Sequence, residues 1–234
     1  PNATFGVNII ARSLNLRAGD EVLITDHEYG ACENIWDFLS QSEGFSIQRA
    51  RIPLPLPDPD QIVDRLLDQT SSRTRLIFVS QITSPTAVQM PVKALCTEAR
   101  SRGIMTLIDG AHGPGQLPLD LNALGADYYT GNCHKWLLSP KGAGFLYVRK
   151  AHQEGIKPLV VSWGWGKNCP YSSDTRMLDL LEYWGTKDPA AYLSVPRAID
   201  FQFENKWDAV RKRCQNLLGD ALSEIRKLTG MPSI

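Results

Sequence analysis

Residues 104–112 read IMTLIDGAH, and this stretch decides the fold. The apolar run Ile104–Ile108 predicts a buried strand, and the carboxylate of Asp109 follows it directly. A second apolar run, Leu76–Val79, is typical of a parallel strand that is covered on both faces. A helical pattern from Val92 to Arg102 connects the two runs. Strand, helix and strand in this order indicate a parallel pair.

The same alternation continues on both sides of this unit. Further predicted strands are Glu21–Thr25, Ser46–Ile52, Tyr128–Thr130 and Gly144–Val148. Further predicted helices are Phe5–Leu14, a segment with Ile35, Trp36 and Leu39 on one side, and a segment with Asp58 as N-cap and Pro59 in its first turn. We therefore expect an α/β fold, a three-layer α/β/α sandwich with a mostly parallel sheet.

The domain organisation follows from where this alternation ends. Residues 1–203 are predicted to form the large domain. Within residues 204–234, helical spacing of apolar residues predicts a long amphipathic helix that leads toward a small domain, most of which this chain lacks. Because the chain begins at Pro1 and stops shortly after Gly230, we expect it to be cut at both ends.

Composition excludes several classes of protein. The 234 residues include 25 basic and 25 acidic side chains, so the formal charge is zero, and no basic block predicts a nucleic acid or an anionic membrane as partner. No apolar run approaches the roughly 20 residues that span a bilayer. The 5 cysteines form no CxxC pair. A cytoplasmic location is therefore predicted.

Two residues carry the strongest chemical signal. Lys135 lies in Gly131–Trp136, which precedes a glycine-rich segment, and Asp109 ends the predicted strand at the sheet edge where such folds bind ligands. A lone lysine in such a turn is more often a solvated surface residue. Together, however, a lysine that forms an imine and an acid that keeps a pyridine nitrogen protonated are the two groups that pyridoxal phosphate requires.

These segments resemble a known family. Residues 109–112, 132–136 and 140–142 resemble the class V aminotransferase family of fold-type I pyridoxal-phosphate enzymes. Within that family, residues 25–30 and 131–135 look most like isopenicillin N epimerase-like proteins. Cysteine desulfurases and carbon–sulfur lyases are relatives of this group.

The resemblance implies pyridoxal 5′-phosphate as cofactor and assigns the residues around its ring. Lys135 would hold the cofactor as a Schiff base and shuttle the Cα proton, and Asp109 would pair with the pyridine nitrogen. His27 matches the catalytic aromatic residue that stacks on the ring. His112 matches a donor to the phenolic oxygen. Ser84 lies where desulfurases carry an Asn near the ring and the substrate carboxylate.

The resemblance also implies a phosphate site. Its members would be Ala3, Thr4, Asn132, His134 and, from the neighbouring subunit of a homodimer with shared active sites, Thr186. Asn132 departs from the Ser found in many desulfurases. The family's substrate-carboxylate Arg and the desulfurase nucleophile would lie in a C-terminal region that the chain lacks.

Other interpretations of these residues stay open. Thr4 is alternatively a simple N-cap, and His27 a hydrogen-bonded loop histidine. A metal site built from Asp109, His112, Cys133 and His134 matches no closed zinc pattern, and no metal is predicted. Cys133 beside His134 is alternatively a thiol nucleophile.

The leading functional prediction is an enzyme that epimerises an amino acid or a peptide-borne amino acid at Cα. The first alternative is β-elimination of a carbon–sulfur bond, as in lyases and desulfurases, or aminotransfer. The second alternative is a catalytically incomplete cofactor-binding or assembly domain. The tryptophans Trp163, Trp165 and Trp184 are compatible with a buried two-fold interface or with packing inside one subunit.

Overall fold

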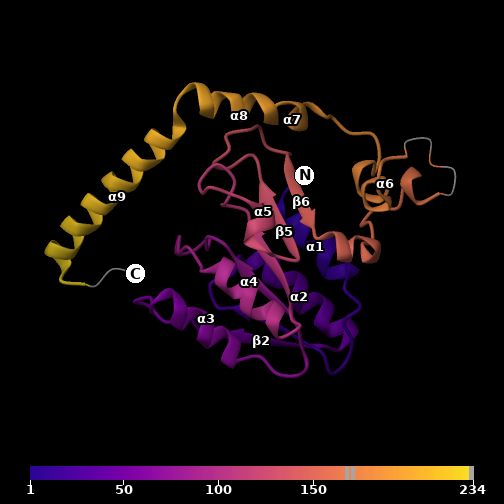
Figure 1. Ribbon diagram of the computed structural model, residues 1–234, viewed down its shortest axis with the longest axis horizontal. Coiled ribbons are helices and arrows are strands. Elements are labelled where there is room, and N and C mark those ends of the chain that lie inside the picture. Colours follow the sequence, from indigo (N-terminus) through magenta and orange to yellow (C-terminus); the bar gives the residue numbers. More distant parts are fainter. Residues whose placement is uncertain (167–168, 170–171, 232–234) are drawn as a thin grey trace.

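The computed structural model describes residues 1–166, 169 and 172–231. A six-stranded sheet in the order β2-β1-β3-β4-β5-β6 forms its centre (Figure 1). The strands are β1 (Glu21–Thr25), β2 (Ser46–Ala50), β3 (Thr74–Ser80), β4 (Met105–Gly110), β5 (Tyr128–Asn132) and β6 (Gly144–Val148). All neighbouring strands pair in parallel except β5 and β6, which are antiparallel. The predicted mostly parallel α/β fold is confirmed.

Helices cover both faces of this sheet. The helices are α1 (Ala3–Ser13), α2 (Gly30–Glu43), α3 (Pro59–Asp68), α4 (Val92–Ser101), α5 (Leu121–Leu124), α6 (Arg176–Glu182), α7 (Ala190–Leu193), α8 (Val195–Glu204) and α9 (Trp207–Thr229). Short 3-10 helices span Lys150–Gly155 and Trp163–Trp165.

Successive residues of the central strands point to opposite faces, and each face packs on its own helices. Phe78 and Leu107 pack with residues of α1 and α2, whereas Ile77 and Ile108 pack with residues of α3 and α4. The runs are apolar throughout because both faces of the sheet are buried. The predicted three-layer sandwich is therefore present.

Several boundaries differ from the predicted ones. The strand β4 continues to Gly110, so Asp109 lies inside it, paired in register with Ser80 and Thr130. The strand β2 ends at Ala50 rather than Ile52. The hydrogen bonds to neighbouring strands set where each strand ends. These bonds cannot be predicted from the apolar pattern of one segment.

The start of α1 also differs from the prediction. The helix begins at Ala3 instead of Phe5, and Asn2 is its N-cap, with Oδ1 accepting a 2.9 Å hydrogen bond from the N–H of Phe5. The interpretation of Thr4 as an N-cap is therefore wrong. Thr4 lies in the first turn, between Ala3 and Phe5, whose N–H groups donate to the side chains of Asn132 and Asn2. Asp58 does precede α3, but its side chain makes no capping hydrogen bond.

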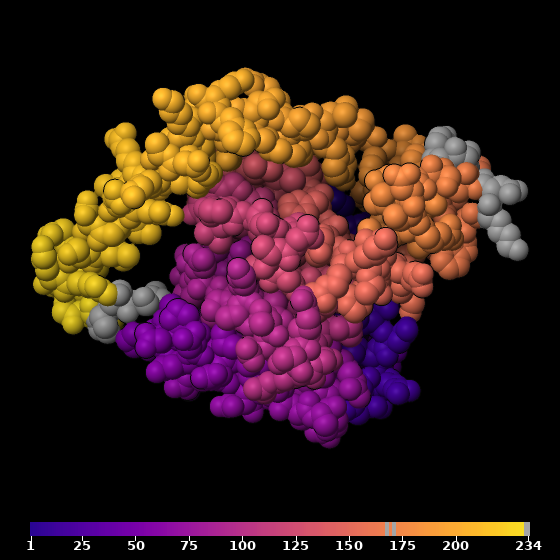
Figure 2. Space-filling view, in the orientation of Figure 1, coloured from indigo at the N-terminus to yellow at the C-terminus, as the bar shows by residue number. Residues whose placement is uncertain are grey.

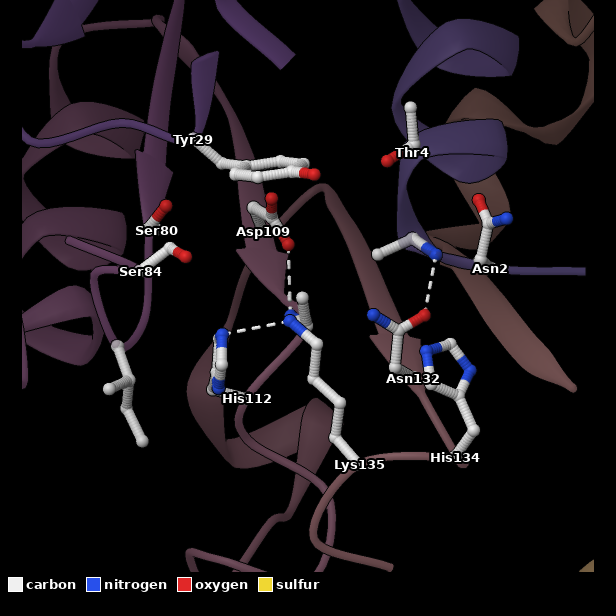
Figure 3. A pocket seen from close by; sticks show the side chains of 13 residues that line it. Asn2, Thr4, Tyr29, Ser80, Ser84, Asp109, His112, Asn132, His134 and Lys135 are labelled. Atoms are coloured by element: carbon white, nitrogen blue, oxygen red, sulfur yellow. Dashed lines mark hydrogen bonds between the residues drawn. The ribbon is translucent and has the colours of Figure 1, made fainter. Parts of the chain in front are cut away.

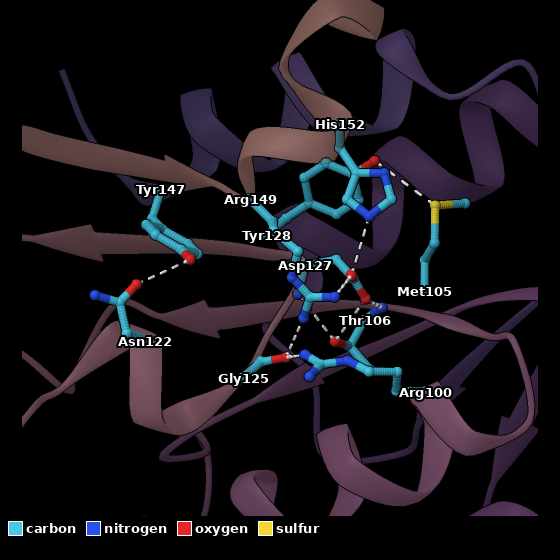
Figure 4. A network of polar contacts seen from close by, with 10 residues as sticks. All are labelled: Arg100, Met105, Thr106, Asn122, Gly125, Asp127, Tyr128, Tyr147, Arg149 and His152. Atoms are coloured by element: carbon cyan, nitrogen blue, oxygen red, sulfur yellow. Dashed lines mark hydrogen bonds and ion pairs between the residues drawn. The ribbon is translucent and has the colours of Figure 1, made fainter.

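A polar network holds β5 in place at the edge opposite the cavity described below (Figure 4). The carboxylate of Asp127 accepts from the backbone N–H of Thr106 at 2.8 Å and lies 2.9 Å from Arg149 Nη1. His152 Nε2 is 3.0 Å from the same carboxylate. These contacts join β4, β5 and the end of β6, and so fix the strand whose other end carries Asn132.

The helix α9 projects from the sheet domain at one end of the molecule (Figures 1 and 2). Its spacing predicts an amphipathic helix, and the helix is present, but Leu217, Leu218 and Leu228 are exposed. The division into residues 1–203 and 204–234 stays a prediction, and residues 232–234 lie outside the described residues. Within the described part of the chain, no helix has the length and apolar character to cross a bilayer.

Candidate functional site

A cavity of about 230 Å³ lies at the carboxyl ends of β3, β4 and β5 (Figure 3). Its lining comes from segments far apart in the sequence, because parallel strands bring their carboxyl ends to one edge. The lining residues are Asn2, Ala3, Thr4, Tyr29, Ser80, Ile82, Ser84, Asp109, Ala111, His112, Asn132, His134 and Lys135. The cavity thus brings together the predicted Lys135 and Asp109.

Asp109 is a buried carboxylate with neutral donors. Its Oδ1 accepts from the N–H of Ala111 at 2.9 Å, and the thiol of Cys32 donates to Oδ2 at 3.6 Å. Burial raises the pKa of Asp109, while these two donors and the charge of Lys135 act in the opposite direction. No ion pair to Asp109 is found among the described residues. A cationic group in the cavity would therefore stabilise its charge.

Lys135 enters the cavity from the turn after β5. Its Nζ lies 2.8 Å from Nε2 of His112, whose Nδ1 accepts from the indole N–H of Trp136 at 3.1 Å. Burial lowers the pKa of Lys135, and the charge of Asp109 counteracts this. Burial also lowers the pKa of His112, and the charge of Lys135 adds to the effect. Both shifts favour neutral side chains at this point.

The other side of the cavity is built around the N-terminus of α1. Oδ1 of Asn132 accepts from the N–H of Ala3 at 2.8 Å, and Thr4 and His134 lie beside this pair (Figure 3). Nδ1 of His134 is buried and has no hydrogen-bond partner among the described residues. An orphaned polar atom next to a helix N-terminus suits an anionic group with several oxygens.

The turn after β1 supplies an aromatic wall that sequence reasoning missed. Tyr29 lines the cavity (Figure 3), and the neighbouring Glu28 is buried. Oε2 of Glu28 accepts from the N–H and the hydroxyl of Ser80 at 2.8 and 2.6 Å. Oε1 accepts from the hydroxyl of Thr25 at 2.6 Å. Burial raises the pKa of Glu28 to about 7 in spite of these bonds.

Two of the predicted site residues do not line this cavity. His27 is buried outside the cavity. Its Nε2 lies 2.9 Å from the carbonyl of Ile52, and its Nδ1 lies 3.0 Å from Oγ1 of Thr86. This is the position of a hydrogen-bonded loop histidine, and Tyr29 takes the wall that the resemblance assigned to His27. Thr186 is exposed on the segment between α6 and α7. The other predicted residues all line the cavity.

The signal for Tyr29 was present in the sequence. Two aromatic rings, His27 and Tyr29, follow the strand that ends at Thr25, and an alternating pattern alone does not tell which one faces the ligand. Asn2, Ser80 and Ile82 also line the cavity without having been predicted. The cap made by Asn2 and the bonds of Ser80 to Glu28 depend on contacts between distant segments.

Known proteins match this chain over nearly its whole length. The family model described as aminotransferase class-V matches residues 1–233. Isopenicillin N epimerase of Amycolatopsis lactamdurans is 40% identical over 226 residues, which cover 92% of this chain and 57% of that protein. A probable chloroplastic L-cysteine desulfhydrase of Arabidopsis thaliana is 31% identical over 207 residues, 83% of this chain and 42% of that protein.

A solved structure supports the same grouping. The cystine C-S lyase C-DES, in a structure with glycine covalently linked to its PLP cofactor, superposes with a TM-score of 0.77 and 25% identity. The match covers 87% of this chain and 54% of that one. The chain spans about half the length of the curated relatives it matches.

Proposed function

Because the chain belongs to the class V aminotransferase family, we propose that it forms the cofactor-binding part of a pyridoxal-phosphate enzyme that acts at the Cα of an amino acid or a peptide-borne amino acid. The membership confirms the resemblance drawn from residues 109–112 and 132–136. The observation that carries the proposal is the convergence of Lys135 and the buried Asp109 in one cavity. These are the two groups that pyridoxal phosphate requires.

The residues present fit this cofactor. A buried carboxylate without an ion pair among the described residues suits a protonated pyridine nitrogen. The buried Nδ1 of His134 and the positive end of the helix dipole at the N-terminus of α1 suit a phosphate. Asn132 holds that turn against β5 through Ala3.

Each side chain then has a defined task. Pyridoxal phosphate, when bound, supplies the electron sink that weakens a bond at the substrate Cα. Lys135 would hold the cofactor covalently and, as a neutral amine, would be the base for the Cα proton. Asp109 keeps the ring nitrogen protonated. Tyr29 provides an apolar wall for one face of the ring.

We place epimerisation before carbon–sulfur cleavage. The 40% identity to an isopenicillin N epimerase exceeds the 31% identity to a probable L-cysteine desulfhydrase. Both reactions begin with proton removal by the same lysine, so Lys135 and Asp109 do not distinguish them. The similarity to the desulfhydrase and to C-DES keeps β-elimination as the second candidate.

Trapping of the cofactor tests the proposal. The protein is mixed with pyridoxal phosphate, reduced with borohydride, digested and examined by mass spectrometry. We expect the pyridoxyl group on Lys135, and we expect it to be absent in Lys135→Ala but present in the matched control Lys141→Ala. A label on Lys141 in the wild type would contradict the assignment.

The two candidate reactions are separated by their products. An epimerase exchanges the Cα hydrogen of its substrate for deuterium in heavy water and yields both configurations at that carbon. A carbon–sulfur lyase instead releases sulfide from L-cysteine. Sulfide release without any change of configuration would replace the first candidate by the second.

We further propose a homodimer with shared active sites. Thr186 is exposed, as a residue that reaches a neighbouring subunit must be. Trp163 and Trp165 are also exposed, by 61% and 57%, whereas Trp184 packs on Phe5 within the chain, with ring centroids 5.0 Å apart. Exposed tryptophans are typical of the centre of a protein interface.

A further inference from the structure

The indole of Trp136 is connected to Lys135 through a single imidazole. The N–H of Trp136 lies 3.1 Å from Nδ1 of His112, and Nε2 of the same ring lies 2.8 Å from Nζ of Lys135. The indole and imidazole ring centroids are 6.5 Å apart. Lys135 and Trp136 are neighbours in sequence, so two consecutive side chains contact the two ring nitrogens of His112.

The hydrogen-bonding capacity of Trp136, His112 and Lys135 shows which of their nitrogens carry protons. An indole nitrogen only donates, so Nδ1 of His112 must accept. A neutral imidazole with an acceptor at Nδ1 carries its proton on Nε2. This N–H points at Nζ of Lys135, which accepts only as a neutral amine because an ammonium group has no lone pair.

The surrounding charges agree with this assignment. Asp109 and the thiol of Cys32 are the acidic groups that act on Lys135, and both favour its charged form. Burial acts more strongly and lowers the pKa of Lys135. The pKa of His112 is lowered as well, so the ring is held neutral.

The backbone of Trp136 is held by two other segments of the chain. Gly115 has φ +79° and lies so close to the carbonyl of Trp136 that a Cβ at this position would collide with it. The turn that follows His112 therefore packs directly on the backbone of Trp136. Nε2 of Gln202 donates to the same carbonyl at 2.7 Å. Two contacts from other segments thus hold the backbone that carries the indole.

We propose that Trp136 is a positioning residue that selects the tautomer of His112 with its proton on Nε2, directed at Lys135. The consequence for chemistry rests on the proposed function. Because only a neutral amine attacks an aldehyde or takes a proton from Cα, this tautomer keeps Lys135 ready for both. With the cofactor bound, the same N–H would be available as the donor that the family resemblance assigns to the phenolic oxygen.

Nitrogen NMR tests the tautomer without any cofactor. The protein has 4 histidines, so ¹⁵N spectra of ring-labelled protein are assignable with one His112→Gln variant. We expect the wild type to show His112 protonated at Nε2 and not at Nδ1. In Trp136→Phe, which keeps an aromatic ring but lacks the N–H, the ratio of the two tautomers should shift toward Nδ1–H by about two- to tenfold, the range that one neutral hydrogen bond sustains. The control Phe38→Leu changes an exposed ring of α2 outside the cavity and should leave the ratio unchanged.

A second measurement connects the tautomer to the lysine. The rate at which Lys135 captures pyridoxal phosphate at neutral pH should fall in Trp136→Phe by a similar factor, and it should be unchanged in Phe38→Leu. An unchanged tautomer ratio in Trp136→Phe, or a wild-type His112 protonated at Nδ1, would overturn the proposal. If the wild type captures no pyridoxal phosphate, the proposed function fails, and the NMR result still decides the role of Trp136.

Discussion

Oδ1 of Asn132 accepts a hydrogen bond from the backbone N–H of Ala3, which ties the end of β5 to the first turn of α1 at a distance of 2.8 Å. The two residues are separated by 129 positions in the chain. This bond sets the distance between Lys135, in the turn after β5, and the helix N-terminus that would bind a phosphate.

We expect Asn132→Ala to destabilise the protein. The change leaves the buried N–H of Ala3 without a partner, which costs about 1–3 kcal/mol of the free energy of unfolding. Denaturation in urea measures this cost. The control Asn122→Ala removes an exposed contact to Tyr147 and should change the free energy by less than about 0.5 kcal/mol. Equal stability of the two variants would contradict the role of Asn132.

The second prediction concerns the charge of Asp109. Asp109→Asn should still bind pyridoxal phosphate but lose turnover by about 10²-fold or more, because an amide does not keep the pyridine nitrogen protonated. Steady-state kinetics and cofactor titration together measure the two effects. The control Asp120→Asn affects only the N-cap of α5 and should keep its rate. Near-normal turnover in Asp109→Asn would refute the assigned role.

Glu28 predicts a pH dependence of stability. Its pKa is raised from 4.5 to about 7 in the folded protein, so between these two values the unfolded chain ionises while the folded protein keeps the proton. The free energy of unfolding should therefore fall as pH rises through this window, by up to about 3 kcal/mol. Below pH 4.5 the carboxyl is protonated in both states and contributes its full stabilisation.

The variant Glu28→Gln isolates this contribution. Glutamine resembles the protonated acid and does not titrate, so the variant should gain stability relative to the wild type as pH rises from 4.5 to 7. Unfolding curves of both proteins at several pH values provide the comparison. A difference that is independent of pH would show that folding does not raise the pKa of Glu28.

The contacts of His27 predict that it acts on a loop and not on the cofactor. Its Nδ1 lies 3.0 Å from Thr86, in the loop that carries Ser84 to the cavity wall. His27→Ala should leave the dissociation constant of pyridoxal phosphate within about twofold, whereas Tyr29→Leu should raise it by about two- to tenfold through lost ring contact. Equilibrium titration measures both constants. The opposite order would restore His27 as the residue that stacks on the ring.

The last prediction concerns assembly. If Thr186 completes the phosphate site of a partner subunit, Thr186→Val should weaken cofactor binding without changing the fold of its own chain, because its side chain is exposed there. Sedimentation gives the oligomeric state, and titration gives the affinity. A monomer at micromolar concentration that binds pyridoxal phosphate tightly would rule out shared sites.

The sequence by itself determined the strands, the layers and the reactive pair. The runs that became β1 and β6 have the predicted bounds, and Lys135 and Asp109 meet as predicted. The pattern of apolar residues within one segment indicates which faces of a strand are buried. Parallel pairing then brings the carboxyl ends of the strands to one edge of the sheet, so the positions of Lys135 and Asp109 follow from the strand order.

Only the tertiary structure decided which side chains complete the cavity. Tyr29 rather than His27 forms its wall because Glu28, between them, is bonded to Ser80 at the end of another strand and so sets the direction of the turn. The hydrogen bond from the indole of Trp136 to Nδ1 of His112 likewise joins separate segments, and Gly115 and Gln202 hold the backbone of Trp136. Such choices are made by contacts between segments far apart in the chain. The sequence pattern of one segment does not predict them, because the direction of a side chain at the end of a strand depends on its contacts with other segments.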